Sequence, residues 1–304
     1  MTFHKPALSV RDQIKLLAQR GMEITAHDQA EHYLTHINYY RLRAYWLPYE
    51  ITNQNGEHQF RDNTRFADVI AIYQFDRALR LLLLDAIERI EISLRSRWAN
   101  YLSLNYGVFA HHDGSIFQRQ ETWQRCCEEL DKEFQRSHET FAKHYQERYN
   151  HLATPPIWVS CELMSIGHLS RWIQNLRKPH DRQAIADTYG LDEIVLVSFL
   201  HHLTIVRNHC AHHGRIWNRR LTVKMRLPSK KPAELASVFN RNADAHGRLY
   251  NTLAMLAYLL RGISPESHWR NKLIELLDSC PQASIDVMGF PHDWKTLPLW
   301  EEAL

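Results

Sequence analysis

Residues 64–104 constrain the fold most, because they contain neither glycine nor proline and their apolar residues return at three- and four-residue steps. These apolar residues are Phe66, Ile70, Tyr73, Leu81, Leu84, Ile87, Leu94 and Trp98. Such spacing places them on one face of a helix. About forty residues is long for a helix of a globular protein, so we expect one very long helix or a helix that kinks or breaks. With only 10 glycines and 11 prolines in 304 residues, the chain is predicted to be all-α.

Residues that commonly start or stop helices divide the rest of the chain into further predicted helices. Ser9 caps a first helix that Gly21 stops, and Thr25 to Asp28 forms a capping box for a second helix reaching toward Tyr40. Further helices are expected over 115–149 (two helices, split near Ser137), 158–172, 181–189, 192–213, 244–261 and 266–277. In the last three, Asp192, Asp244 and the Ser264-Pro265 pair are the expected starts, and Gly214 is the expected stop of the 192–213 helix. Residues 54–58 are predicted to turn. The tail, Met288–Trp294 and Leu297–Trp300, is apolar enough that we expect it to dock on the rest of the fold.

Composition narrows the class of protein without assigning a function. The formal net charge of +3 is too small to indicate a polyanionic partner, so an electrostatic argument has to be local. The five cysteines form no CxxC pair, which suits a reducing compartment, and no signal peptide or membrane-spanning run is apparent. We therefore expect a cytoplasmic protein with no membrane segment.

The stretch from Thr204 to Arg215 is the most site-like in the chain. It ends an apolar-periodic segment formed by Leu196, Phe199, Leu200, Leu203, Val206 and Cys210. Asn208 and His212 are four residues apart and share a helix face, with Arg207 next to them around the helix. A packed helix thus presents an acid/base group, an amide and a fixed cation near one end.

The Arg-x4-His spacing is uninformative by itself. With 27 arginines and 20 histidines in 304 positions, chance gives about two such pairs, and the chain has two: Arg207 with His212, and Arg241 with His246. Context favours the first pair, because it leads into residues 207–231, which hold eight lysines and arginines and no acid. Asp244 lies inside the second pair, where a carboxylate would repel a phosphate.

The chemistry open to the first pair is phosphodiester cleavage through the 2′-hydroxyl of RNA. His212 is suited to proton transfer because imidazole titrates near neutrality. Arg207 is suited to hold the phosphate and stabilise charge developing on it, and Asn208 to orient either partner. No metal or other cofactor is required. Within residues 207–231, the segment without acidic residues, we expect RNA to be bound by Arg215, Arg219, Arg220 and Lys224.

Two alternatives stay open at this point. His209 and His213 have the i, i+4 spacing of zinc ligands on a helix, although no HExxH motif and no third ligand is apparent. Residues 37–49 interleave aromatic residues with Arg41 and Arg43. This pattern is typical either of base stacking with phosphate contact or of an aromatic core segment whose arginines reach the surface, and we favour the core interpretation.

The chain resembles the Abi-like (AbiD/AbiF-type) abortive-infection proteins of the HEPN superfamily. The resemblance rests on Ile37–Trp46, Asp85–Arg95, Pro156–Trp158 with Ser165–Ser170, and Arg207–His212, and the Met288-Gly-Phe-Pro tail fits too. Ile166 stands where the family would have an aromatic residue. The resemblance implies a HEPN-like helical bundle that dimerises, so that two Arg-x4-His motifs face one cleft and act as a metal-independent RNase.

Residue by residue, the resemblance makes Arg207 and His212 catalytic, with Asn208 the polar residue after the arginine. It also implies that Glu88 and Glu91 lie near the cleft, with Arg95 four residues beyond Glu91 in the order that favours an ion pair. We expect an N-terminal helical and aromatic region (1–60), a HEPN-like core (61–262) and a C-terminal helix with its tail (263–304). The expected function is that of a toxin or phage-defence effector checked by an antitoxin RNA or protein. The alternatives are a HEPN-type protein that binds RNA without cutting it and a helical scaffold.

Overall fold

The computed structural model describes residues 6–53, 56–149 and 154–301, and nearly all of its regular structure is helical. The all-α fold class is therefore confirmed. The chain forms two compact units. Unit 1 comprises residues 1–79 and 274–284, and unit 2 comprises residues 80–273 and 285–304. The three-region division expected from the sequence stays a prediction.

Unit 1 is built from three short helices, a hairpin and the start of a long helix. Its elements are α1 (Val10–Gln19), α2 (His27–His36), α3 (Tyr39–Trp46), the 3-10 turn η1 (Leu47–Tyr49), β1 (Glu50–Thr52), β2 (His58–Phe60) and the first turns of α4 (Phe66–Tyr106). The strands are antiparallel, with Glu50 opposite Phe60, which confirms a reversal of the chain between them; residues 54 and 55 lie outside the described residues.

The predicted first helix is confirmed, and the second is partly wrong. The Ser9 hydroxyl accepts from the Asp12 amide to cap α1, and Gly21 beyond it has φ +93°. The capping box does not form, because α2 begins at His27 behind Ala26, which makes no side-chain cap. The helix also ends at His36 instead of continuing, since Asn38 caps a separate helix, α3, by accepting from the Tyr40 amide.

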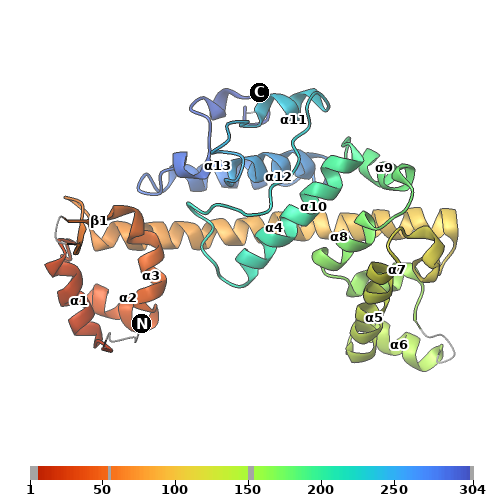
Figure 1. Cartoon of the computed structure of the whole chain (residues 1–304), viewed down its shortest axis with the longest axis horizontal. Coiled ribbons are helices and arrows are strands. Elements are labelled where there is room, and N and C mark those ends of the chain that lie inside the picture. The colour runs from red at the N-terminus through yellow and green to blue at the C-terminus, as the bar shows by residue number, and fades with distance from the viewer. Residues whose placement is uncertain (1–5, 54–55, 150–153, 302–304) are drawn as a thin grey trace. The chain divides into compact units, whose positions relative to one another are not determined.

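Helix α4 runs without interruption for 41 residues (Figure 1). The expected alternative of a break is therefore wrong. Its buried residues, such as Ile72, Leu79, Leu83 and Leu94, repeat along the helix and keep it packed over its length.

Unit 2 contains the remaining helices. They are α5 (Gln120–Arg136), α6 (Thr140–Arg148), α7 (Ile157–Ser160), α8 (Ile166–Gln174), α9 (Pro179–Asp187), α10 (Glu193–Ala211), α11 (Ala233–Val238), α12 (Tyr250–Ile263) and α13 (Trp269–Asp278), which extends into unit 1 at its end. Short 3-10 turns lie between them: η2 (Ala110–His112), η3 (Gly114–Ile116), η4 (Cys161–Leu163), η5 (Asp286–Met288) and η6 (Trp294–Thr296). The split of residues 115–149 into two helices is confirmed.

Helices α8 and α10 pack closely, as Figure 1 shows. A Cβ atom built on Gly167 of α8 would lie 3.0 Å from the Thr204 Cγ2 of α10, so only glycine fits without displacement. Large side chains fill the core around them, with the rings of Trp98 and Trp172 centred 5.8 Å apart.

Toward the C-terminus the predicted helix starts are displaced. Helix α12 begins at Tyr250, and Asp244 does not cap it but pairs with Arg220 at 2.7 Å. The Ser264-Pro265 start is also wrong, because α13 begins at Trp269 and it is the Ser267 hydroxyl that accepts from the Trp269 amide. Helix α11 was not expected.

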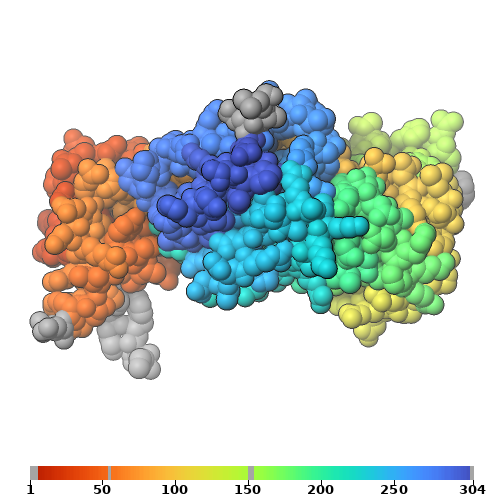
Figure 2. Space-filling model, turned by 90° about the horizontal axis from the view of Figure 1, so that it is seen from above, coloured from red at the N-terminus to blue at the C-terminus, as the bar shows by residue number. Residues whose placement is uncertain are grey.

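The predicted docking of the tail is confirmed. Phe290, Trp294 and Trp300 are buried, and the Trp300 indole donates to the Tyr250 hydroxyl at 3.2 Å. Figure 2 shows the tail, in dark blue, packed against neighbouring segments of unit 2. Among the described residues, no helix combines the length and apolar content needed to cross a bilayer.

Candidate functional site

The candidate site lies at the C-terminal end of α10. The helix starts where the Asp192 carboxylate accepts from the Ile194 amide at 2.8 Å, as expected. Its buried stripe is Val195, Leu196, Phe199, Leu200, Leu203, Val206 and Cys210, together with His202. This stripe fixes which face of α10 packs inward, and the residues between its members are directed outward.

A Schellman-type turn ends the helix. The Gly214 amide donates to the His209 carbonyl at 2.7 Å, and the His213 amide donates to the Cys210 carbonyl at 3.1 Å. The left-handed residue is His213, with φ +57°, and not the expected Gly214. Histidine is one of the few non-glycine residues that adopt this conformation with some frequency. The helix thus stops at Ala211 and leaves His212 as its C-cap.

Arg207, Asn208 and His212, which we call the Arg207 site, face outward on the last turns of α10. Arg207 is half-buried, whereas Asn208 and His212 are exposed. The Arg207 guanidinium donates to the Asn208 side-chain oxygen at 3.4 Å. Within the described part of the chain, no hydrogen bond or ion pair engages the His212 ring. The site therefore offers an accessible imidazole beside a guanidinium that an amide partly orients.

The second Arg-x4-His pair is used differently. The Arg241 guanidinium donates to the carbonyls of Pro228 and Ala236, at 2.5 and 3.3 Å. His246 Nε2 lies 3.0 Å from the Met225 carbonyl and donates to it. The two side chains hold the carbonyls of Met225 and Pro228 in the loop before α11 and that of Ala236 within α11, so this pair has a structural role.

The two zinc-ligand candidates do not form a donor cluster. The His209 ring packs under Gly214, where an added Cβ would lie 3.4 Å from Nδ1. Burial, with a contribution from the Arg219 charge, lowers the pKa of His209, which keeps this imidazole neutral. Among the described residues, no group of three or more histidine, cysteine, aspartate or glutamate side chains is arranged to hold a metal ion.

The basic segment after the site is ordered against unit 2. Buried His202 of α10 donates from Nδ1 to the Val223 carbonyl at 2.6 Å and accepts at Nε2 from Thr252 at 2.7 Å. The Arg226 amide donates to Ser198 of α10 at 2.7 Å. These bonds hold the backbone that carries the basic side chains along α10.

The four expected RNA-binding residues differ in how they are engaged. Arg220 pairs with Asp244, but both side chains are largely exposed, so water and salt screen the pair. Arg219 donates to the Arg215 carbonyl. The Lys224 side chain lies beside Gly247 and makes no ion pair with a described residue. Asp244 thus offsets part of the positive charge of this segment.

Glu91 and Arg95 pair as expected, at 2.5 Å, and both are mostly buried. Arg95 also donates to the Met164 carbonyl, next to the residue that caps α8. No contact among the described residues joins Glu91 or Arg95 directly to Arg207 or His212. The ion pair holds the start of α8, and α8 in turn packs on Thr204, one helical turn before Arg207.

Glu88, the remaining expected supporting residue, is exposed. Its carboxylate forms no ion pair with a described residue. Its proximity to a cleft stays a prediction.

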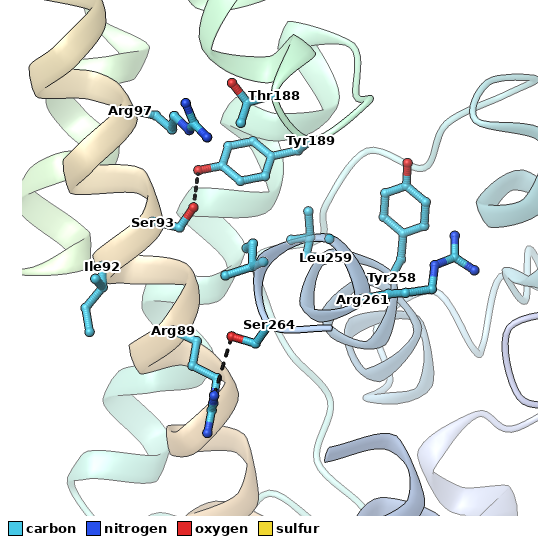
Figure 3. A pocket seen from close by; sticks show the side chains of 12 residues that line it. Arg89, Ile92, Ser93, Arg97, Thr188, Tyr189, Tyr258, Leu259, Arg261 and Ser264 are labelled. Atoms are coloured by element: carbon cyan, nitrogen blue, oxygen red, sulfur yellow. Dashed lines mark hydrogen bonds between the residues drawn. The ribbon is translucent and has the colours of Figure 1, made fainter. Parts of the chain in front are cut away.

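A cavity of about 670 Å³ in unit 2, which we call the arginine cavity, was not expected from the sequence (Figure 3). It is lined by α4, the end of α9 and the end of α12, and it includes Arg89, Arg97 and Arg261. Arg89 pairs with Asp85 and Glu266, and Arg261 with Glu234. No histidine or carboxylate is among its lining residues, so the cavity presents cations without a group for proton transfer near neutral pH.

A buried Ser160–His111 contact resembles a nucleophile with its base but cannot reach a substrate. The Ser160 hydroxyl lies 3.3 Å from His111 Nε2, and both residues are fully buried. The hydroxyl donates to the Pro155 carbonyl at 2.9 Å, so its proton is already used. Burial lowers the pKa of His111 to about 3. This pair is structural.

One comparison with known proteins supports the Abi-like part of the resemblance noted from the sequence. The family model of the Abi-like proteins matches residues 32–218, which extend from α2 to beyond the Arg207 site. Neither the comparison with curated proteins nor that with solved structures gives a significant match. Because the matched segment covers more than half of the chain, the chain belongs to the Abi-like protein family.

Proposed function

We propose that this protein is a metal-independent endoribonuclease of the HEPN type that acts as an effector of abortive infection. The observation that carries the proposal is the difference between the two Arg-x4-His pairs. Arg241 and His246 are engaged with backbone carbonyls, whereas His212 is exposed and, among the described residues, the Arg207 guanidinium donates only to Asn208. Family membership supports the biological setting, since abortive infection is the role after which the Abi-like proteins are named.

In the proposed reaction His212 takes the proton of an RNA 2′-hydroxyl. The 2′-oxygen attacks the adjacent phosphorus, the bond from phosphorus to the 5′-oxygen breaks, and a proton is delivered to that leaving oxygen. The products are a 2′,3′-cyclic phosphate and a 5′-hydroxyl. Arg207 binds the phosphate and stabilises the charge that develops on its oxygens, and Asn208 orients Arg207 through their hydrogen bond.

We further propose that two copies of the chain form the working enzyme. A single Arg207 site supplies one imidazole, whereas the reaction needs a base and an acid. If two sites face one cleft, His212 of the partner subunit protonates the leaving oxygen. The exposure of Asn208 and His212 is compatible with such a shared cleft.

The second candidate is RNA binding without cleavage, favoured by the basic segment that His202 and Ser198 hold along α10. For both candidate functions the substrate or ligand is RNA. We propose that an antitoxin RNA or protein restrains the activity. The two candidates differ in whether His212 transfers a proton.

Induction in cells separates these candidates. Wild type should arrest growth and leave RNA fragments with 2′,3′-cyclic phosphate ends, and His212→Ala should do neither at equal protein level. His201→Ala, which removes an exposed histidine from the same helix, is the matched control and should behave as wild type. Growth arrest that persists in His212→Ala without RNA cleavage would favour the binding candidate, and full cleavage by that variant would reject the proposed site.

A further inference from the structure

Unit 1 contains a second cavity, of about 700 Å³, formed by α1, α2, α3 and the hairpin. We call it the tyrosine pocket after two of its lining residues, Tyr39 and Tyr40. Its size is that of a small-molecule site. All of its lining residues belong to unit 1, so it is separate from the Arg207 site, which belongs to unit 2.

The aromatic stretch at residues 37–49 divides between the core and this pocket. Leu42, Tyr45 and Trp46 are buried, and the Tyr45 hydroxyl donates to Asp76 at 2.6 Å, as the core interpretation predicted. Tyr39 and Tyr40 instead line the pocket, and Tyr40 is 77% exposed. Stabilising the fold accounts for the burial of Leu42, Tyr45 and Trp46. It does not require Tyr40 to be exposed beside the cavity.

Two buried polar atoms without a partner belong to residues of the same pocket. They are the side-chain oxygen of Gln13, an acceptor, and Nε of Arg43, a donor. The other ends of both side chains are held, since Gln13 donates to the Leu8 carbonyl at 3.1 Å and Arg43 donates to Glu50 at 3.1 Å. Buried polar atoms are almost always hydrogen-bonded, and these two have almost no accessible surface, so a ligand in the cavity satisfies them only when their side chains turn toward it.

The pocket also holds a cation, Arg20, that no described residue neutralises. The Arg20 guanidinium lines it and makes no hydrogen bond or ion pair with any described residue. The nearby acid is Glu50, and it is already paired with Arg43 and lies 3.8 Å from His58. A negatively charged group entering the pocket would therefore meet Arg20 without displacing a carboxylate.

From these features we infer that the tyrosine pocket binds a nucleotide unit, with the base against Tyr40 and the phosphate at Arg20. A nucleobase supplies a flat face for stacking and, on its edge, both an acceptor for Arg43 Nε and a donor for Gln13 when these two side chains turn toward the cavity. Apolar Leu16 and Leu34 complete the wall beneath it. This inference rests on the proposed function, because in a ribonuclease the nucleotide unit is supplied by a single-stranded part of the RNA. A free mononucleotide would offer the same chemistry.

The test measures binding, and it uses the full chain carrying His212→Ala so that RNA stays intact. The probes are a fluorescein-labelled single-stranded oligoribonucleotide and the four ribonucleoside 5′-monophosphates. Tyr40→Ala should weaken oligoribonucleotide binding roughly 5- to 150-fold, the range expected for one base stacked on an aromatic ring. Tyr40→Phe, which keeps the ring, should stay within about twofold of the parent. Tyr33→Ala, outside the pocket in the same unit, is the matched control.

A second readout places the ligand directly. An oligoribonucleotide containing 4-thiouridine should crosslink to the peptide that carries Tyr39 and Tyr40, and Gln13→Leu should reduce that crosslink. Oligoribonucleotide binding that exceeds mononucleotide binding identifies RNA as the source, and comparable binding of a mononucleotide identifies a free nucleotide.

Unchanged binding by Tyr40→Ala, or crosslinks that avoid this peptide, would overturn the inference and leave the ribonuclease proposal intact. Conversely, full cleavage by the His212→Ala variant would reject the ribonuclease proposal but would leave the inferred nucleotide binding at Tyr40 unaffected.

Discussion

The crossing of α8 over α10 allows a quantitative test of how the Arg207 site is positioned. A Cβ atom on Gly167 would lie 3.0 Å from Thr204 Cγ2, compared with an optimal carbon–carbon separation of about 3.5–4.0 Å. Gly167→Ala gains about 1 kcal/mol in helix propensity, but overpacking a close contact costs about 1–3 kcal/mol. We therefore expect the free energy of unfolding of Gly167→Ala to be unchanged or up to about 2 kcal/mol lower.

Thr204→Ser supplies the control, because it removes the methyl group that clashes and keeps the hydroxyl that donates to the Leu200 carbonyl at 2.9 Å. In the Thr204→Ser background, Gly167→Ala should stabilise the protein by about 1 kcal/mol, which is the propensity gain alone. The assay is a double-mutant cycle by urea unfolding followed by tryptophan fluorescence. An equal effect of Gly167→Ala in both backgrounds, meaning no coupling between the two positions, would refute this account of the crossing.

Three further predictions concern protonation and the two arginine–histidine pairs. Burial holds the pKa of His111 at about 3, below the ordinary value of 6.5, so the unfolded chain binds more protons between these values. The free energy of unfolding should thus fall as the pH is lowered below 6.5, by up to about 1.4 kcal/mol per pH unit from this residue. Urea unfolding at pH 7.5 and 5.5 should show a smaller loss for His111→Gln, and an equal loss would contradict the assignment. Arg241→Ala should lower the free energy of unfolding by about 1 kcal/mol, because the carbonyls of Pro228, which is buried, and Ala236, which is partly exposed, lose their donor, while cleavage per folded molecule stays unchanged; reduced cleavage at full stability would instead give this pair a part in the reaction. Arg207→Ala should reduce single-turnover cleavage roughly 100- to 1000-fold, as loss of a group stabilising transition-state charge does, and Asn208→Ala should reduce it less; a reversed order would reject the roles assigned to them.

Features that depend on local chemistry were predictable from the sequence. Ser9 and Asp192 cap helices as expected, and the apolar periods of residues 64–104 and 196–210 identified most of the buried positions, although Leu81 is 53% exposed. In each case the deciding interactions lie within a few residues of one another, and propensity and periodicity describe such interactions well.

The errors arose where a distant partner decided the outcome. Asp244 suits a helix cap, but its carboxylate pairs with Arg220, 24 residues away, and α12 starts later. Ser264 looked like a cap for the next helix, yet its hydroxyl accepts from Arg89 of α4 and Ser267 caps α13 instead. Both side chains are engaged by partners far away in the sequence, and local preference does not describe such contacts.

The candidate sites divide in the same way. The Arg207 site lies within six consecutive residues of one helix, so its members were apparent together in the sequence. The tyrosine pocket joins Gln13 and Arg20 of the first helical segment to Tyr40 and Arg43 of the third, and no sequence spacing relates them. The aromatic stretch was the available signal, and only the exposure of Tyr40 separates its ligand-facing residues from its core residues.

Cleavage of RNA by the purified chain, with His212→Ala compared with His201→Ala, tests the central claim most directly. The account predicts that His201→Ala cleaves like wild type, in the presence of chelator and with 2′,3′-cyclic phosphate ends. It predicts that His212→Ala, folded to the same extent, is slower by roughly 100- to 10,000-fold, the contribution of a general acid or base. Equal cleavage by the two variants, or cleavage that requires a metal ion, would contradict it.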